Sequence, residues 1–249
     1  MQRSAARGPA WLVLPTYEEA ENLEPLVAAA LANLPGSAHV LVVDDDSPDG
    51  TGEIADRLAA AEPRIEVLHR PRKEGLGPAY LAGFRRALAA GAGFVLEMDC
   101  DFSHDPADLP RLLEAAGEAD LAIGSRYVGG GGVEDWSALR KAISRGGSAY
   151  ARLVLGLPVR DLTGGFKCFR REVLEAIDLD SVDSRGYAFQ VEMTYRTLRA
   201  GFQVVEVPIH FRDRRAGASK MSGKIVAEAA WRVPLLRLGG VPEGTPPAR

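Results

Sequence analysis

The sequence is poor in cysteine and has no long apolar run. Among its 249 residues only two are cysteines, Cys100 and Cys168, and their separation matches no metal-ligand spacing. This usage argues against a disulfide framework or a zinc site and suits a reducing compartment. No apolar run approaches the roughly 20 residues that a membrane-spanning helix needs. We therefore expect a cytoplasmic protein that is soluble or peripheral to a membrane.

The chain also lacks an excess of positive charge and a signal peptide. Its formal net charge is −4, which gives no reason to expect a nucleic-acid partner. Residues 1–9 contain no apolar core of the kind that a signal peptide needs, and the proline-rich residues 241–249 are too polar to pack. Because 46% of the residues are hydrophobic, the chain can bury one large core. We predict one domain over residues 10–238, flanked by flexible tails at residues 1–9 and 239–249.

Short apolar runs alternate with segments whose apolar residues recur at helical spacing. Six of these runs have the composition of buried strands: residues 10–14, 39–43, 64–68, 94–98, 120–127 and 203–208. Strands and helices that alternate in this way are typical of βαβ units, which place parallel strands between layers of helices. The sequence therefore predicts an α/β fold with a mostly parallel sheet and helices on both faces.

Three of the predicted helices begin with residues that typically cap helices. Thr16 and Glu19 match a capping box, in which Thr16 caps the helix and Glu19 reaches back to it. Thr51 is placed to cap the helix after the second strand, and Asp105 stands directly before a proline at a helix start. Each of these residues therefore has a purely structural interpretation.

Two carboxylates follow the strand at residues 94–98. Asp99 and Asp101 would point the same way if the strand continued, with Cys100 pointing to the other face. Ligands of open α/β sheets bind at this carboxyl edge. Paired carboxylates suit a hard cation such as Mg²⁺ or Mn²⁺, whose other positions are filled by substrate phosphate. The alternative is an acidic turn that only leads into the next helix.

Acidic residues also follow the first two strands. Residues 44–49 hold more carboxylates than a turn needs, and Asp44 and Asp45 have no evident role within that turn. Such carboxylates suit ribose hydroxyls and the N–H groups of a guanine or uracil base, although a solvated acidic loop is the alternative. The turn Pro15–Glu19 carries two carboxylates and no glycine, whereas a pyrophosphate-binding dinucleotide turn needs glycines. We expect it to hold the base and ribose end of a nucleotide.

Basic residues in the second half of the chain are candidates for binding phosphate. Arg126, Arg140 and Ser144 can converge on one phosphate, which the planar guanidinium fork suits well, or they can lie on exposed surface. The loop Arg212–Lys224 is basic, glycine-containing and too polar for the core. We predict that it is mobile and closes over an anionic ligand.

Seven segments carry motifs that occur in one order: Leu14–Glu19, Val43–Thr51, Met98–His104, Gly124–Tyr127, Leu162–Phe166, Gly186–Met193 and Arg214–Lys220. Together they resemble the polyprenyl- or dolichyl-phosphate mannosyltransferases, which are GT-A glycosyltransferases of family 2. The resemblance covers residues 11 to 225, nearly the whole chain. Two positions depart from the family pattern. Cys100 replaces the usual alanine, and Ser103 stands where some relatives have glutamine, which would weaken the second metal ligand.

The resemblance implies a Rossmann-like GT-A fold and an inverting transfer of mannose from GDP-mannose to a polyprenyl or dolichyl phosphate. It assigns donor binding to Pro15, Tyr17, Glu19, Val43, Asp45, Asp99, Cys100, Asp101, Arg126, Arg214 and Lys220. It assigns catalysis to Asp101 and Arg126, a Mg²⁺ or Mn²⁺ cofactor to Asp101 and Ser103, and the acceptor phosphate to Arg126, Arg140 and Ser144.

Two other functions remain open: a lipid-phosphate glucosyltransferase that uses UDP-glucose, and a catalytically silent subunit that binds nucleotide sugars. A lipid acceptor also implies contact with the cytoplasmic face of a membrane. The predicted helices at residues 136–157 and 225–238 mix cationic and apolar residues and are the candidate contacts, unless both simply cover the sheet. A separate membrane-anchoring subunit would be another route to the lipid.

Overall fold

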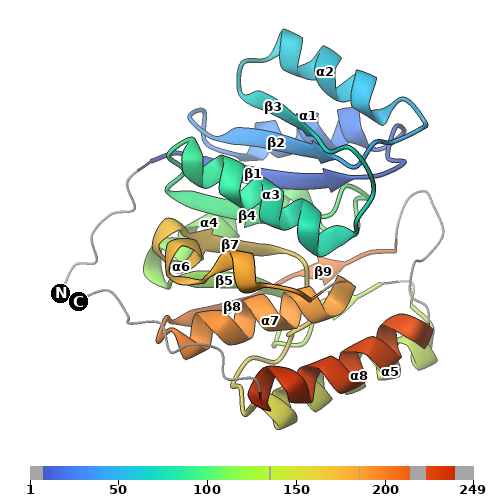
Figure 1. The fold of residues 1–249 in the computed structure, drawn as a ribbon, viewed down its shortest axis with the longest axis vertical. Helices are drawn as coiled ribbons and strands as arrows, with labels where there is room; N and C mark the ends of the chain where they lie inside the picture. The colour runs from blue at the N-terminus through green and yellow to red at the C-terminus, as the bar shows by residue number, and fades with distance from the viewer. Residues whose placement is uncertain (1–7, 135, 185, 214–222, 239–249) are drawn as a thin grey trace.

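The computed structural model describes residues 8–134, 136–184, 186–213 and 223–238, and a seven-stranded sheet forms its centre (Figure 1). The strands are β1 (Ala10–Thr16), β2 (His39–Asp44), β3 (Ile65–His69), β4 (Phe94–Glu97), β5 (Leu121–Ser125), β7 (Lys167–Arg170) and β8 (Val204–Pro208). Their order is β3-β2-β1-β4-β7-β5-β8, and only β7 runs antiparallel to its neighbours. The predicted α/β fold with a mostly parallel sheet is confirmed, whereas β7 was not predicted.

Helices cover both faces of this sheet, as expected. The alternation of β1 divides the core, because Leu12 and Leu14 face one helical layer and Trp11 and Val13 face the other. The first layer contains α1 (Leu23–Asn33), α2 (Thr51–Ala61) and α4 (Leu109–Glu118). The second contains α3 (Leu76–Ala89), α6 (Arg171–Ala176) and α7 (Gly186–Arg199).

Two further helices lie beside the second layer. α5 (Ala138–Leu155) and α8 (Gly223–Leu238) pack against each other below α7 in Figure 1. The short strands β6 (Gly132–Val133) and β9 (His210–Phe211) pair near them, and two 3₁₀ turns, η1 (Pro106–Asp108) and η2 (Leu179–Ser181), complete the described elements. Within the described ranges, no helix has the length and apolar character required to cross a membrane.

The helix starts differ from two of the three capping predictions. Thr16 is the last residue of β1, and α1 begins only at Leu23, so the predicted capping box is wrong. Thr51 is the first residue of α2, and its N–H donates 3.1 Å to the carboxylate of Asp49, which acts in its place. Asp105 does cap the next turn, as predicted, because its side chain accepts a backbone N–H. The sheet pairing of β1 with β2 outcompeted the local capping pattern.

Candidate active site

A cavity of about 270 Å³ opens at the carboxyl edge of the sheet, where β1, β2 and β4 end. Most of the predicted donor-binding residues line it: Pro15, Tyr17, Glu19, Asp45, Asp99, Cys100 and Asp101. The structure therefore brings together residues from three loops that are far apart in the sequence.

The loop after β4 places Asp99, Cys100 and Asp101 on the same cavity wall. Cys100 also packs in the core cluster of the first helical layer, and β4 ends at Glu97, so the predicted strand alternation does not continue through these residues. Phe102 then takes a left-handed backbone conformation with φ of 58°, and the N–H of Ser103 donates 3.0 Å to Asp101 Oδ1. A turn rather than a strand thus orients these carboxylates.

Left-handed backbone at residues other than glycine is concentrated around this cavity. Within the described ranges only Glu18, Asp46 and Phe102 show it, each with φ of 58°. They lie in the loops after β1, β2 and β4 respectively. Such conformations persist where surrounding contacts hold them, and they cluster at functional sites.

Asp44 and Asp45 have different surroundings. Asp44 accepts hydrogen bonds from the Thr16 hydroxyl at 3.1 Å and from the Ser47 hydroxyl at 2.6 Å, so the expectation that it lacks a role in the turn is wrong. Asp45 lines the cavity and forms an ion pair with Arg70. Burial raises the pKa of Asp45, although the charge of Arg70 opposes the rise. A buried carboxylate whose pKa is raised and which lines a cavity is a candidate ligand-binding group.

Asp101 and Ser103 have a chemistry that fits a divalent cation. Both are buried, and the Ser103 hydroxyl makes no hydrogen bond to any described residue. Across the described ranges, no group of three or more His, Cys, Asp or Glu residues could hold a metal without further ligands. One carboxylate and one hydroxyl suit Mg²⁺ or Mn²⁺ only if a substrate phosphate and water supply the other positions. Ser103 itself does not line the cavity.

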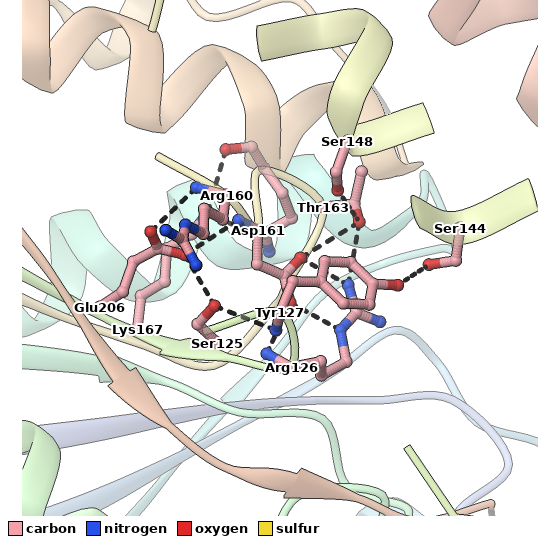
Figure 2. Close-up of polar contacts among 11 residues, drawn as sticks. Ser125, Arg126, Tyr127, Ser144, Ser148, Arg160, Asp161, Thr163, Lys167 and Glu206 are labelled. Atoms are coloured by element: carbon pink, nitrogen blue, oxygen red, sulfur yellow. Dashed lines mark hydrogen bonds and ion pairs between the residues drawn. The ribbon is translucent and has the colours of Figure 1, made fainter. Parts of the chain in front are cut away.

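Arg126 forms a buried ion pair next to the cavity. Its Nε and Nη2 each donate 2.7 Å to the carboxylate of Asp161, and Nη2 also donates 2.9 Å to the Thr163 hydroxyl (Figure 2). Burial acts to raise the pKa of Asp161, but the charge and hydrogen bonds of Arg126 outweigh it, so that pKa lies below 3.8. Arg126 does not line the cavity, whereas Thr163 does and links the two.

The predicted acceptor residues lie together around two aromatic rings. The Tyr127 hydroxyl donates 2.6 Å to the Ser144 hydroxyl (Figure 2), and the Tyr127 ring lies 5.1 Å from the Arg126 guanidinium. The guanidinium of Arg140 lies 4.1 Å from the centre of the Trp136 ring, and that of Arg126 lies 5.8 Å from it. The fold therefore gathers Arg126, Arg140 and Ser144 into one cluster.

Arg140 differs from Arg126 in the exposure of its counter-ion. Its Nη1 lies 2.9 Å from the carboxylate of Asp213, whose side chain is 41% exposed. The side chain of Asp161, in contrast, is completely buried. Water and small anions therefore have better access to the Arg140 pair than to the Arg126 pair.

Besides Arg126, three of the predicted donor residues are not placed at the cavity. Val43 is fully buried within β2 and packs in the core. Arg214 and Lys220 lie outside the described residues, as does most of the loop Arg212–Lys224 that contains them. The predicted tails also fall largely outside the described ranges.

Lys73, Thr163 and Gln190 line the cavity, although the sequence analysis gave them no role. Lys73 follows β3, and its Nζ lies 3.5 Å from the centre of the Tyr17 ring. Thr163 follows a buried aspartate, and Gln190 lies near the start of α7. Position after a strand or at a helix start was one signal that could have indicated them, and Thr163 and Gln190 also lie in the motifs Leu162–Phe166 and Gly186–Met193.

The chain is similar to proteins that transfer mannose to lipid phosphates. A family model described as "Glycosyl transferase family 2" matches residues 11–178. An undecaprenyl-phosphate mannosyltransferase of Micrococcus luteus is 53% identical over 221 residues, which are 89% of this chain and 90% of that protein. A polyprenol monophosphomannose synthase of Mycolicibacterium smegmatis is 51% identical over 224 residues, covering 89% of this chain and 84% of that protein.

A solved structure shares the fold at much lower sequence identity. Glucosyl-3-phosphoglycerate synthase from Mycobacterium tuberculosis, crystallised with Mn²⁺, UDP and glucosyl-3-phosphoglycerate, aligns with a TM-score of 0.64 at 20% identity. The alignment covers 95% of this chain and 82% of the synthase. At this identity the likeness concerns the fold, and it confirms the GT-A architecture expected from the sequence.

Proposed function

The chain belongs to glycosyl transferase family 2 and is an enzyme of the polyprenyl-phosphate mannosyltransferase type, and from this premise we propose that its donor is GDP-mannose and that it requires Mg²⁺ or Mn²⁺. The observation that carries the proposal is the cavity at the sheet edge, with carboxylates on its walls and a cluster of arginines beside it. A nucleotide sugar and a lipid phosphate need these two kinds of group in adjacent positions.

The nucleoside end of the donor is assigned to the loops after β1 and β2. Glu19 and Asp45 line the cavity there, and carboxylates accept hydrogen bonds from guanine N–H groups and ribose hydroxyls. Tyr17 and Pro15 supply apolar surface beside them. Val43 is buried in β2, directly before the loop that carries Asp45, and we assign it only to the support of that loop.

The diphosphate is assigned to the loop after β4. Asp99 and Cys100 line the path toward the sugar, and Asp101 and Ser103 would hold the cation. When bound, such a cation neutralises charge that develops on the leaving diphosphate. Arg214 and Lys220, which lie outside the described residues, are proposed to add positive charge on the other side.

The acceptor phosphate is assigned to the cluster of Arg126, Arg140 and Ser144. The second pKa of a phosphate monoester is about 6, so at pH 7 the acceptor is already an anionic nucleophile. One phosphate oxygen attacks the anomeric carbon from the side opposite GDP. A C–O bond to the lipid phosphate forms as the C–O bond to GDP breaks, and the configuration inverts. The residues need only orient the two substrates and exclude water.

Contact with a membrane surface is proposed for α5 and α8. Each helix exposes apolar side chains that recur at helical spacing and form one stripe: Leu139, Ile143, Tyr150 and Leu153 on α5, and Trp231, Leu235 and Leu238 on α8. Arginines flank both stripes, which favours the cytoplasmic face with its anionic lipids. Sedimentation with anionic vesicles at low and high salt tests this contact. Failure to bind at any salt would favour a separate membrane-anchoring subunit.

A donor panel tests the proposed reaction. Purified chain is incubated with a short polyprenyl phosphate and Mn²⁺, and with either GDP-mannose or UDP-glucose. We expect GDP release in equal amount to lipid-linked mannose, and little release of UDP. Preferential turnover of UDP-glucose would identify a glucosyltransferase, and binding of nucleotide sugars without release would identify a silent subunit. Omission of the metal should stop the reaction.

A further inference from the structure

One buried amide at the cavity has a donor that no described residue accepts in a well-formed hydrogen bond. Gln190 lies on α7, is 1% exposed and lines the cavity. Its Nε2 atom makes no well-formed hydrogen bond within the described ranges, although one side of the amide lies near the buried Glu97 carboxylate. Because a buried donor without an acceptor destabilises a fold, such a group at a cavity wall indicates that a ligand supplies the acceptor.

The orientation of this amide is fixed from behind by Lys167. The Nζ of Lys167 donates 3.0 Å to the main-chain oxygen of Gln190 and also donates to Gln190 Oε1. An ammonium group can only donate, so the amide oxygen must face Lys167 and the amide nitrogen must face away from it. Lys167 is fully buried and lies 3.6 Å from the Glu97 carboxyl group, whose pKa burial raises to about 7. The lysine thus serves as a positioning residue.

The amide nitrogen lies next to a carboxylate, across a position that lacks a side chain. A Cβ at Gly165 would lie 3.4 Å from Gln190 Nε2 and 3.8 Å from Asp99 Oδ2. All three residues line the cavity, so the missing side chain leaves space between an amide donor and a carboxylate acceptor. Tyr80 holds that carboxylate in place, since its hydroxyl donates 3.2 Å to Asp99 Oδ1.

This pair lies at the end of the cavity that faces the arginine cluster. Thr163 and Gly165 line the same wall, and Thr163 accepts a hydrogen bond from Arg126. In the proposed reaction the hexose lies between the diphosphate and the acceptor phosphate. The wall formed by Thr163, Gly165 and Gln190 is therefore the wall beside the hexose.

We propose that Gln190 recognises the hexosyl group of the donor, with one sugar hydroxyl accepting from Nε2 and its neighbour donating to Asp99. This inference rests on the proposed function. Adjacent donor and acceptor groups match two neighbouring hydroxyls, whose axial or equatorial placement distinguishes one hexose from another. Gln190 thus determines specificity for the sugar and makes no contact with the nucleotide.

The test compares binding of GDP-mannose with binding of GDP, which lacks the hexose. Gln190→Met keeps a similar volume and removes the amide. Gln190→Glu keeps the acceptor for Lys167 and replaces the amide donor with a carboxylate oxygen beside Asp99, so it remains informative if the methionine variant folds poorly. Calorimetry with Mn²⁺ should show a roughly 10- to 100-fold weaker affinity for GDP-mannose in both variants. The loss should exceed any loss of GDP affinity by at least about tenfold in each. Gln203→Leu, at an exposed position outside the cavity, is the matched control and should change neither.

Two results would overturn the inference. Unchanged GDP-mannose affinity in both variants would remove Gln190 from the donor site, and equal losses for GDP and GDP-mannose would place it on the nucleotide or diphosphate. The binding assay does not depend on turnover. A wild-type chain that binds GDP-mannose and transfers nothing to lipid phosphate would refute the proposed reaction, while the binding comparison would still decide the role of Gln190.

Discussion

The donor and acceptor halves of the site hold their carboxylates in opposite ways. Beside the donor cavity, burial raises the pKa of Asp45, and the paired Arg70 does not fully offset it. In the acceptor cluster, the charge of Arg126 more than offsets burial and holds the pKa of Asp161 below 3.8. The fold therefore favours the ionised form of Asp161. At Asp45, in contrast, burial disfavours the ionised form. In the donor half, a carboxylate that lines the cavity is left with a raised pKa and can bind a ligand. In the acceptor half, the charge of Asp161 is neutralised by Arg126 within the protein.

This difference predicts how an acceptor phosphate enters. The Arg126–Asp161 pair is buried and bidentate, so separating it would leave an uncompensated charge. The Arg140–Asp213 pair is partly exposed and exchanges its counter-ion more easily. We infer that phosphate displaces Asp213 from Arg140, while Arg126 stays paired with Asp161 beside the Tyr127 and Trp136 rings.

Removing charge from the cation site should have the largest effect on activity. Asp101→Asn keeps the acceptor for the Ser103 N–H and loses the negative charge. Turnover at saturating Mn²⁺ should fall by roughly 10²- to 10³-fold, with a thermal midpoint close to that of the wild type. Ser103→Ala is the matched comparison and should lose at most about tenfold, because water can replace a neutral hydroxyl ligand. Normal turnover of Asp101→Asn would remove Asp101 from the metal site.

The largest effect on stability should come from the acceptor half. Asp161→Asn leaves Arg126 buried without a counter-ion, and the free energy of unfolding at pH 7 should fall by about 3 kcal/mol. Asp45→Asn should change it by less than about 1 kcal/mol, because the ionised form of Asp45 is not favoured by the fold. Urea unfolding of both variants measures the difference. Equal losses would contradict the comparison between the two halves.

Acid should abolish the stability contributed by Asp161. Because its pKa is lower in the folded chain than in the unfolded chain, the contribution is complete well above the unfolded pKa and is lost as the pH falls through the folded pKa. The difference in unfolding free energy between the wild type and Asp161→Asn should therefore be constant near neutral pH and shrink on acidification. A difference that grows on acidification would show that the pKa is raised instead.

The smallest effect is expected at Asp213. Because the ion pair is partly exposed, Asp213→Asn should change the free energy of unfolding by less than about 1 kcal/mol. Asp213 competes with the acceptor phosphate for Arg140. Asp213→Asn should lower the KM for polyprenyl phosphate by about twofold, because asparagine forms no ion pair with Arg140. Initial rates at varied lipid phosphate measure the change. An increased KM would show that Asp213 assists acceptor binding.

The cavity carboxylates could be predicted from the sequence because each follows a continuous apolar strand. Asp45, Asp99 and Asp101 come at or just after the ends of β2 and β4, and the sheet topology brings such ends to one edge. The mistakes near them arose where tertiary contacts overrode a local pattern. Thr16 continued β1 by pairing with β2, although Thr16 and Glu19 match the sequence pattern of a capping box.

The interior polar network could not have been predicted in this way. The sequence analysis assigned Lys167 no role, yet β7 carries it into the core, where it contacts Glu97 and Gln190. These three residues are far apart in the chain, and no local spacing relates them. Similarly, the bidentate partner of Arg126 lies in a separate loop, at Asp161. Such pairings become visible only when the fold is known.

The steady-state kinetics of Arg140→Gln test the separation of the two halves most directly. The KM for polyprenyl phosphate should rise roughly tenfold or more, because a charge-assisted contact to the acceptor is lost. The KM for GDP-mannose should stay within about twofold of the wild-type value, since Arg140 does not line the donor cavity. A parallel rise in both KM values, or no change in that for polyprenyl phosphate, would contradict separate donor and acceptor sites.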